Sequence, residues 1–128
     1  MGVSLVIQGC VKVDTTETYE IEGKRYGVTR GLFQGRWYHY YERALSYAEG
    51  NFWQEAERDY LKAIELRDAD QLRARTYGVH FVNYFPHREL GIALYHQNRF
   101  EAAIRELEIS LRSHATAKAE YYLDKARK

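Results

Sequence analysis

The chain has 128 residues, a formal net charge of +1, 45% hydrophobic side chains and a single proline. Its length suits one small domain, and its composition is that of a globular protein rather than a disordered or collagen-like one. The balanced charge argues against a dedicated nucleic-acid-binding domain. The one cysteine cannot form an internal disulfide. No run of about 18 apolar residues occurs, which argues against a membrane-spanning segment.

Residues 1–18 contain a short apolar stretch that ends in Cys10. The sequence Leu-Val-Ile-Gln-Gly-Cys resembles the end of a bacterial lipoprotein signal, in which an aliphatic, a variable and a small residue precede a lipid-accepting cysteine. The basic start and longer apolar core of such a signal are absent. Two interpretations stay open: a signal remnant or tether with Cys10 as the lipidation site, or a short β-strand from Val3 to Val13 with an incidental thiol.

Residues 19–35 are predicted to form a short β-hairpin and a linker. Between Tyr19 and Val28, β-branched and aromatic residues flank a Glu-Gly-Lys turn, which is the pattern of a hairpin. An isolated hairpin is only marginally stable, so this one must lean on the rest of the domain or stay mobile.

Residues 36–128 contain a repeat with a spacing of 47 residues. After this shift Ala44 falls on Gly91 and Trp53 on Phe100, so small residues meet small ones and large apolar residues meet large ones. Apolar residues at helical spacing predict two helices in each copy. The predicted helices are Trp37–Glu49 and Gln54 to about Arg67, then Pro86 to about Gln97 and Phe100–Leu111, with a closing helix over 116–128.

The spacing of small and large residues resembles the tetratricopeptide repeat (TPR). In the second copy, His87 is followed by Leu90-Gly91 and Leu94, and later by Ala103 and Leu107. The first copy has the same arrangement from Tyr40 to Tyr60. This resemblance implies an all-α fold, a TPR-like α-solenoid of two helix-turn-helix repeats plus a closing helix, preceded by the short β-hairpin.

The period exceeds the 34 residues of a TPR because of an insertion at residues 68–85. Asp68–Arg75 is predicted to prolong the preceding helix or to form a short helix capped by Asp70. Tyr77–Phe85 is predicted to be an aromatic loop that packs against the helices. Two roles stay open for it: a structural plug, or a segment that shapes the binding groove.

Catalytic and metal-binding patterns are missing from the sequence. The five histidines show no His-x-x-x-His pair and no nearby cysteine partner, and no glycine-rich phosphate loop follows a strand. We therefore expect no metal site, no cofactor and no enzymatic activity. The histidines are His39, His80, His87, His96 and His114.

The TPR resemblance implies a concave groove lined by the first helix of each pair. We expect a protein–protein interaction module that binds a peptide or a partner helix, with an apolar ligand oriented by Glu42, Arg88 and Glu89. The predicted groove residues are Tyr38, Tyr41, Glu42, Leu45, Arg88, Glu89, Ile92, Tyr95 and His96.

The expected partners are a protein or peptide, no nucleic acid, and a membrane only through a lipid on Cys10. That lipid would place the protein in the bacterial periplasm; without it the protein would be cytoplasmic. Two alternatives stay open: an assembly subunit that self-associates through the aromatic insertion, or a docking fragment of a larger enzyme.

Overall fold

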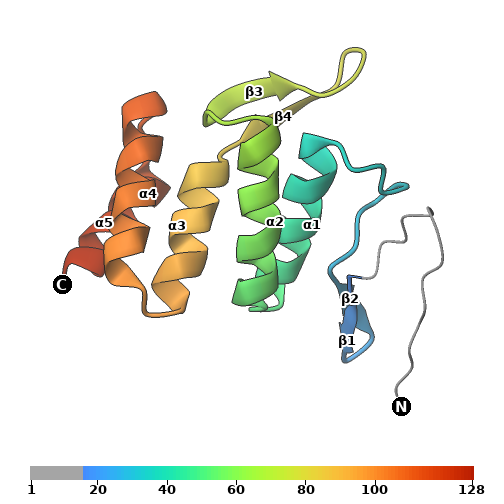
Figure 1. The fold of residues 1–128 in the computed structure, drawn as a ribbon, viewed down its shortest axis with the longest axis horizontal. Coiled ribbons are helices and arrows are strands. Elements are labelled where there is room, and N and C mark those ends of the chain that lie inside the picture. The colour runs from blue at the N-terminus through green and yellow to red at the C-terminus, as the bar shows by residue number, and fades with distance from the viewer. Residues whose placement is uncertain (1–15) are drawn as a thin grey trace.

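The computed structural model describes residues 16–128, which contain five α-helices and two antiparallel two-stranded sheets (Figure 1). The predictions for Cys10 and for a strand from Val3 to Val13 lie outside the described residues. The elements in chain order are β1 (Tyr19–Ile21), β2 (Lys24–Tyr26), α1 (Trp37–Glu49), α2 (Trp53–Leu66), β3 (Gln71–Arg75), β4 (Phe81–Tyr84), α3 (Pro86–His96), α4 (Phe100–Ser113) and α5 (Ala117–Arg127).

The prediction of an all-α solenoid is wrong, because the insertion forms a second β-hairpin. Strands β3 and β4 pair in antiparallel register with an irregularity in β3, where Arg73 has a φ of 63°. The hairpin closes between Thr76 and His80, whose backbone N–H and carbonyl are 2.8 Å apart. Alternating burial along β4 is the pattern of a half-covered strand. The described residues therefore form a mixed helical and β fold.

Asp70 caps a helix, but not the one predicted. Its two carboxylate oxygens accept the backbone N–H groups of His87 at 2.8 Å and Arg88 at 3.1 Å, in the first turn of α3. A carboxylate at this place satisfies backbone donors that a helix start leaves unpaired. Asp70 directly precedes β3, so its hydrogen bonds fix the open end of the β3–β4 hairpin to the beginning of α3.

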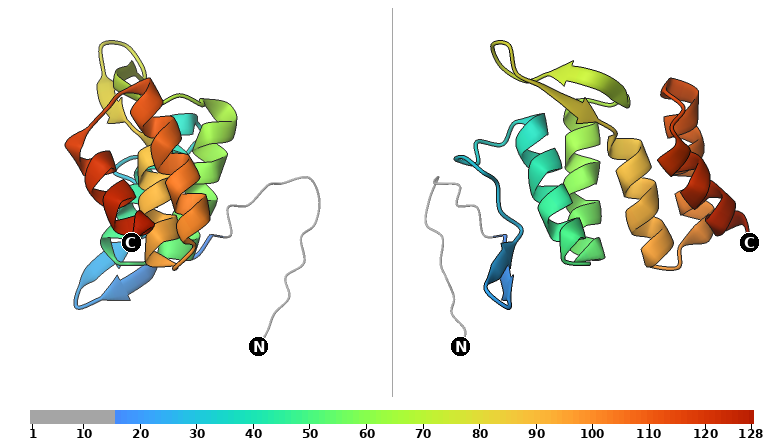
Figure 2. Two further views of the ribbon diagram at one scale, coloured as in Figure 1. Left: turned by 90° about the vertical axis from the view of Figure 1, so that its left-hand side faces the viewer. Right: turned by 180° about the vertical axis from the view of Figure 1, so that it is seen from behind.

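The five helices stand side by side in chain order, each packed against the next (Figure 2). Their contact surface is built from small side chains, since Ala44, Ala56 and Ala103 are fully buried. Gly91 of α3 lies close against α4: a Cβ there would be 2.7 Å from Leu107 Cγ. Close backbone packing therefore depends on residues that lack a side chain or have only a methyl group.

The predicted amino-terminal hairpin is present as β1 and β2, and it leans on the turn between α1 and α2. The ring of Tyr19 stacks on Phe52 with centroids 4.2 Å apart, and its hydroxyl donates to Glu55 at 2.6 Å. Gly27 has a φ of +87° and lies against the Tyr47 ring, where a Cβ would come within 2.4 Å. After this contact the chain runs back along α1, which brings residues 30–36 to the candidate site.

Candidate functional site

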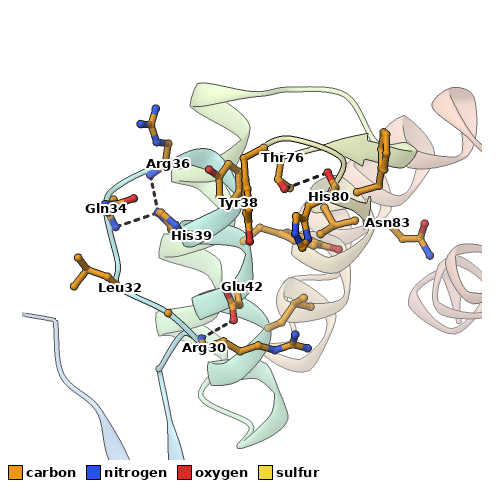
Figure 3. Close-up of a pocket in the computed structure, with 16 residues that line it drawn as sticks. Arg30, Leu32, Gln34, Arg36, Tyr38, His39, Glu42, Thr76, His80 and Asn83 are labelled. Carbon is orange, nitrogen blue, oxygen red and sulfur yellow. Dashed lines mark hydrogen bonds between the residues drawn. The ribbon is translucent and has the colours of Figure 1, made fainter.

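A pocket of about 850 Å³ lies on the exposed side of α1 (Figure 3). One wall is the segment 30–36 and the other is the β3–β4 hairpin, which crosses the end of the helices and projects beyond α1 (Figure 1). The pocket is lined by Arg30, Gly31, Leu32, Gln34, Arg36, Tyr38, His39, Tyr41, Glu42, Leu45, Thr76, Tyr77, His80, Phe81, Val82 and Asn83.

The wall at residues 30–36 is held by acceptors on a single face of α1. His39, Glu42 and Ser46 are three and four residues apart, a spacing that aligns them along a helix. Gln34 N–H donates to His39 Nδ1 at 3.0 Å, and Arg30 N–H donates to Glu42 Oε2 at 2.7 Å (Figure 3). Just before this segment, Ser46 Oγ accepts the N–H groups of Gly27 at 2.9 Å and Val28 at 3.2 Å. Side chains of α1 therefore accept the backbone hydrogen bonds that a neighbouring strand would accept in a sheet.

His39 acts as a neutral acceptor in this wall. Its Nδ1 accepts the backbone N–H groups of Gln34 at 3.0 Å and Arg36 at 3.3 Å, so the ring proton belongs on Nε2. Burial lowers the pKa of His39, an effect opposed by the charge of Glu42 and reinforced by that of Arg36. Protonation of Nδ1 would turn an acceptor into a donor facing two N–H groups.

The hairpin wall is fixed to α1 by aromatic contacts. Tyr84, at the end of β4, is fully buried, with ring centroids 4.6 Å from Trp37 and 4.9 Å from Tyr41. Its hydroxyl donates to the Arg67 carbonyl at 2.7 Å, at the end of α2. Nearer the hairpin tip, the ring of Tyr77 lies 6.0 Å from that of Tyr38. Both pocket walls are thus anchored to the helix that forms the floor.

The pocket has more positive than negative charge available to a ligand. Arg30 and Arg36 are exposed, and neither guanidinium makes an ion pair within residues 16–128. Glu42 is the carboxylate of the lining, and one of its oxygens already accepts from Arg30 N–H. The lining therefore combines aromatic and aliphatic surface with two arginines free to bind an anionic group.

The four residues predicted for the first half of the groove all line this pocket: Tyr38, Tyr41, Glu42 and Leu45. Tyr41 also belongs to the core, since it is only 5% exposed. Its hydroxyl accepts the backbone N–H of Phe85 at 3.1 Å, and burial raises the pKa of this phenol far above its ordinary value. Tyr41 therefore supports the pocket floor, while Tyr38 offers a ring to a ligand.

The other five predicted groove residues lie on α3 and do not line this pocket. Glu89 is buried, with ion pairs to Arg88 at 2.9 Å and to Lys118 of α5 at 3.0 Å. Ile92 is buried in the same helix. These side chains are engaged inside the domain, so the predicted single groove across both helix pairs is not what the structure brings together.

Tyr95 and His96 lie at the opposite end of α3 from the pocket. The His96 ring stacks on Trp53 of α2 with centroids 4.2 Å apart, and Tyr95 contacts Tyr122 of α5 at 5.6 Å. Burial lowers the pKa of His96. Their contacts are those of helix packing around the α3–α4 turn.

Sequence reasoning missed the wall at residues 30–36, and it anticipated the other wall only as one of the two roles left open for Tyr77–Phe85. The segment from Arg30 to Arg36 has no periodicity, and its place depends on N–H groups that bond to α1. The aromatic residues between Tyr77 and Phe85 were the available signal, because a segment this apolar must cover or border something. What the pattern did not indicate was that the segment pairs with Gln71–Arg75 as a strand.

His87 forms a second cluster of titratable groups, away from the pocket. Its Nδ1 lies 2.6 Å from Glu106 and its Nε2 lies 2.7 Å from Asp68. Burial alone would lower the pKa of His87, but the two carboxylates outweigh it and raise the pKa to about 9. The imidazolium thus links α3, α4 and the chain before β3. Within residues 16–128, no group of His, Cys, Asp and Glu side chains is arranged to hold a metal ion.

Comparison with known proteins adds no relative. No protein-family model matches the sequence, and no curated protein matches it. The TPR resemblance and the lipoprotein-like sequence before Cys10 accordingly stay predictions from the residues that suggested them. In the part of the chain that the structure describes, no helix is both long enough and apolar enough to cross a membrane.

Proposed function

We propose that this protein is an interaction module that binds a peptide segment of a partner protein in the pocket over α1. The observation that carries the proposal is the pocket itself, about 850 Å³ in volume and bordered by two anchored walls. Binding sites commonly combine a mostly apolar lining with a few placed polar groups. Tyr38, Leu45 and Phe81 supply the apolar surface here, and Arg30 and Arg36 supply the polar groups.

The hydrogen bonds of His39 and Glu42 favour a positioning role for these two residues of the pocket floor. His39 Nδ1 accepts the backbone N–H groups of Gln34 and Arg36, and one oxygen of Glu42 accepts the backbone N–H of Arg30. A general base needs a lone pair directed at a substrate, whereas these lone pairs are directed at the wall. The polar groups of the floor therefore serve to position the segment 30–36.

The charge of the lining defines the ligand further. The lining contains Arg30 and Arg36, neither of which has an ion pair within residues 16–128, and one carboxylate, Glu42, which already accepts a hydrogen bond. The pocket therefore favours a ligand with an acidic side chain or a carboxylate terminus. Arginine binds carboxylates through two parallel hydrogen bonds. The ligand is thus a segment that presents apolar side chains to Tyr38 and an acidic group to Arg30 or Arg36.

Selection from a library of random ten-residue peptides displayed on phage tests this proposal. Enriched peptides should carry aspartate or glutamate beside apolar residues, and Tyr38→Ala should weaken their binding about tenfold or more. Tyr121→Ala is the matched control, because Tyr121 is an exposed tyrosine of α5, outside the pocket. Failure to enrich any peptide, or equal loss in both variants, would contradict the proposal.

Self-association through the hairpin tip is the second candidate function, and one observation favours it. Val79 is 83% exposed, and its neighbours Tyr77 and Phe81 are 57% and 44% exposed. A cluster of apolar side chains in water is a common sign of an interface. Light scattering over a range of concentrations tests it: Val79→Asp should convert a dimer into a monomer, and a wild-type monomer at all concentrations would exclude this role.

A further inference from the structure

Strand β4 has an open edge. Thr76 N–H donates to the His80 carbonyl across the hairpin, which places His80 at a position whose carbonyl faces β3, and Val82 lies opposite Ala74 two residues further along. Bonded and non-bonded positions alternate along an antiparallel pair, so the backbone groups of Val82 point towards β3. Those of Phe81 and Asn83 consequently point away from β3, to a side where no other strand of residues 16–128 pairs with the sheet.

The open edge borders the pocket over α1. Phe81, Val82 and Asn83 of β4 line the pocket, whereas no residue of β3 does. The next outward-facing N–H along the chain, that of Phe85, donates to the hydroxyl of Tyr41, which lies on the pocket floor. Figure 3 shows Asn83 and the hairpin opposite the segment that carries Arg30 and Arg36.

We propose that the partner segment binds as an extended strand that pairs with β4. This inference rests on the proposed function and adds the binding mode: the ligand accepts hydrogen bonds from the N–H groups of Phe81 and Asn83. An added strand satisfies backbone groups that a sheet edge leaves open, and its alternate side chains enter pockets on either side. A helical ligand could not do this, because its own backbone groups are already bonded.

The charges fix the chemistry of this strand. β4 has four residues, so the paired part of the ligand spans about 13 Å at about 3.3 Å per residue. Side chains on one face of the ligand lie over Tyr38 and Leu45 of α1. The wall opposite β4 presents Arg30 and Arg36, so the occupant is a short extended segment with at least one acidic residue.

Amide hydrogen exchange measured by NMR tests the binding mode, with the peptides enriched by phage selection as the probe. In the free protein, the amides of Phe81 and Asn83 should exchange fast and that of Val82 slowly. Saturation with peptide should slow the exchange of Phe81 and Asn83 at least tenfold and leave Val82 nearly unchanged. Peptides that require Tyr38 but leave both edge amides unchanged would overturn strand addition and retain the pocket as a binding site.

A pair of variants gives an independent measurement. Asn83→Pro removes one outward N–H, which a strand edge tolerates when the group faces solvent, and Asn83→Ala keeps it. Peptide affinity should be about tenfold or more lower in the proline variant than in the alanine variant. Equal affinities in both variants would contradict the inference. N-methylation of the peptide should weaken binding at alternate positions; insensitivity along its whole length would overturn the strand mode.

Discussion

The turn between α1 and α2 and the turn between α3 and α4 have the same backbone geometry. Asn51 and Asn98 occupy the left-handed region with φ values of 65° and 63°, a conformation that asparagine tolerates better than most residues. The next residue in each turn donates its N–H to the carbonyl of Tyr47 or Leu94, at 3.0 Å in both cases. The repeat of 47 residues is therefore visible in backbone conformation as well as in side-chain size.

The two helix pairs differ in what covers their first helix. Glu42 and Leu45 of α1 are partly exposed and line the pocket, while their counterparts Glu89 and Ile92 of α3 are 7% and 5% exposed. The corresponding face of α3 is covered by α5 of the same chain, whose Lys118 forms an ion pair with Glu89. Equivalent positions thus form a pocket on one helix and a closed interface on the other, so position in the repeat does not by itself assign a binding role.

The two helix pairs also differ in the polar side chains that they bury between their helices. The first pair contains a buried ion pair, in which Arg43 binds Asp59 through two hydrogen bonds of 2.7 and 3.1 Å. In the second pair, Leu90 stands where the arginine does and Glu106 where the aspartate does, and Glu106 instead binds His87. The side chain of Asp59 is 2% exposed and that of Glu106 is 23% exposed. The first cluster is therefore the more costly one to break.

Breaking the two clusters should give the largest effect. Asp59→Leu leaves the Arg43 guanidinium buried without its carboxylate and should lower the free energy of unfolding by about 3–5 kcal/mol. Glu106→Leu should cost about 1–2 kcal/mol, because Asp68 still binds His87. Urea denaturation measures both values. Equal losses in the two variants would remove the distinction between the clusters.

A double variant provides the control for this comparison. Replacing both Arg43 and Asp59 by leucine removes the buried guanidinium together with its carboxylate, so most of the loss seen in Asp59→Leu should be recovered. If the double variant is less stable than Asp59→Leu alone, the packing around the pair matters more than its charge balance.

Enlarging Gly91 should have the next largest effect. Gly91→Leu forces a side chain against Leu107 and towards the Ala103 carbonyl, 3.2 Å from an added Cβ, and should cost about 1–3 kcal/mol or more. Gly31→Leu is the matched control, because nothing lies within 4 Å of a Cβ there. Thermal denaturation followed by circular dichroism measures both. An unchanged melting temperature for Gly91→Leu would contradict the close approach of α3 and α4.

The sequence predicted the helices well because their signals are local. Apolar spacing, the breaks at Gly50-Asn51 and Gln97-Asn98, and the proline at the start of α3 each act within one turn. The first hairpin was equally accessible through its Glu-Gly-Lys turn. The second was missed because the alternation of polar and apolar residues over Gln71–Arg75 is too short to separate a strand from a helix extension. The loop that follows also lacks the Asn-Gly or Asp-Gly pair of a two-residue hairpin turn. Propensity alone could not distinguish that strand from a helix extension.

The candidate site was predicted only in part, for a different reason. The TPR resemblance assigned Tyr38, Tyr41, Glu42 and Leu45 to the groove-facing side of their helix, and all four line the pocket over α1. Whether a face is open depends on segments distant in sequence, and the five predicted residues of α3 contact α2 or α5, pair with one another or are buried instead. The walls themselves depend on hydrogen bonds between backbone donors and α1 side chains, which have no signature in residue spacing.

Acidification should weaken peptide binding through His39, the smallest of the expected effects. Because burial lowers the pKa of His39, the stabilisation it gives the wall is fully present above its ordinary pKa of about 6.5 and is lost as the pH falls through the lowered value. Isothermal titration with an enriched peptide should show affinity falling between pH 7.5 and 5. His39→Asn, whose side-chain oxygen can accept the same N–H groups, should lose this dependence, while His80→Asn should keep it. An affinity that rises on acidification would contradict this prediction. It would mean that the positive charge gained by His39 strengthens the binding of an acidic ligand more than the loss of its hydrogen bonds weakens it.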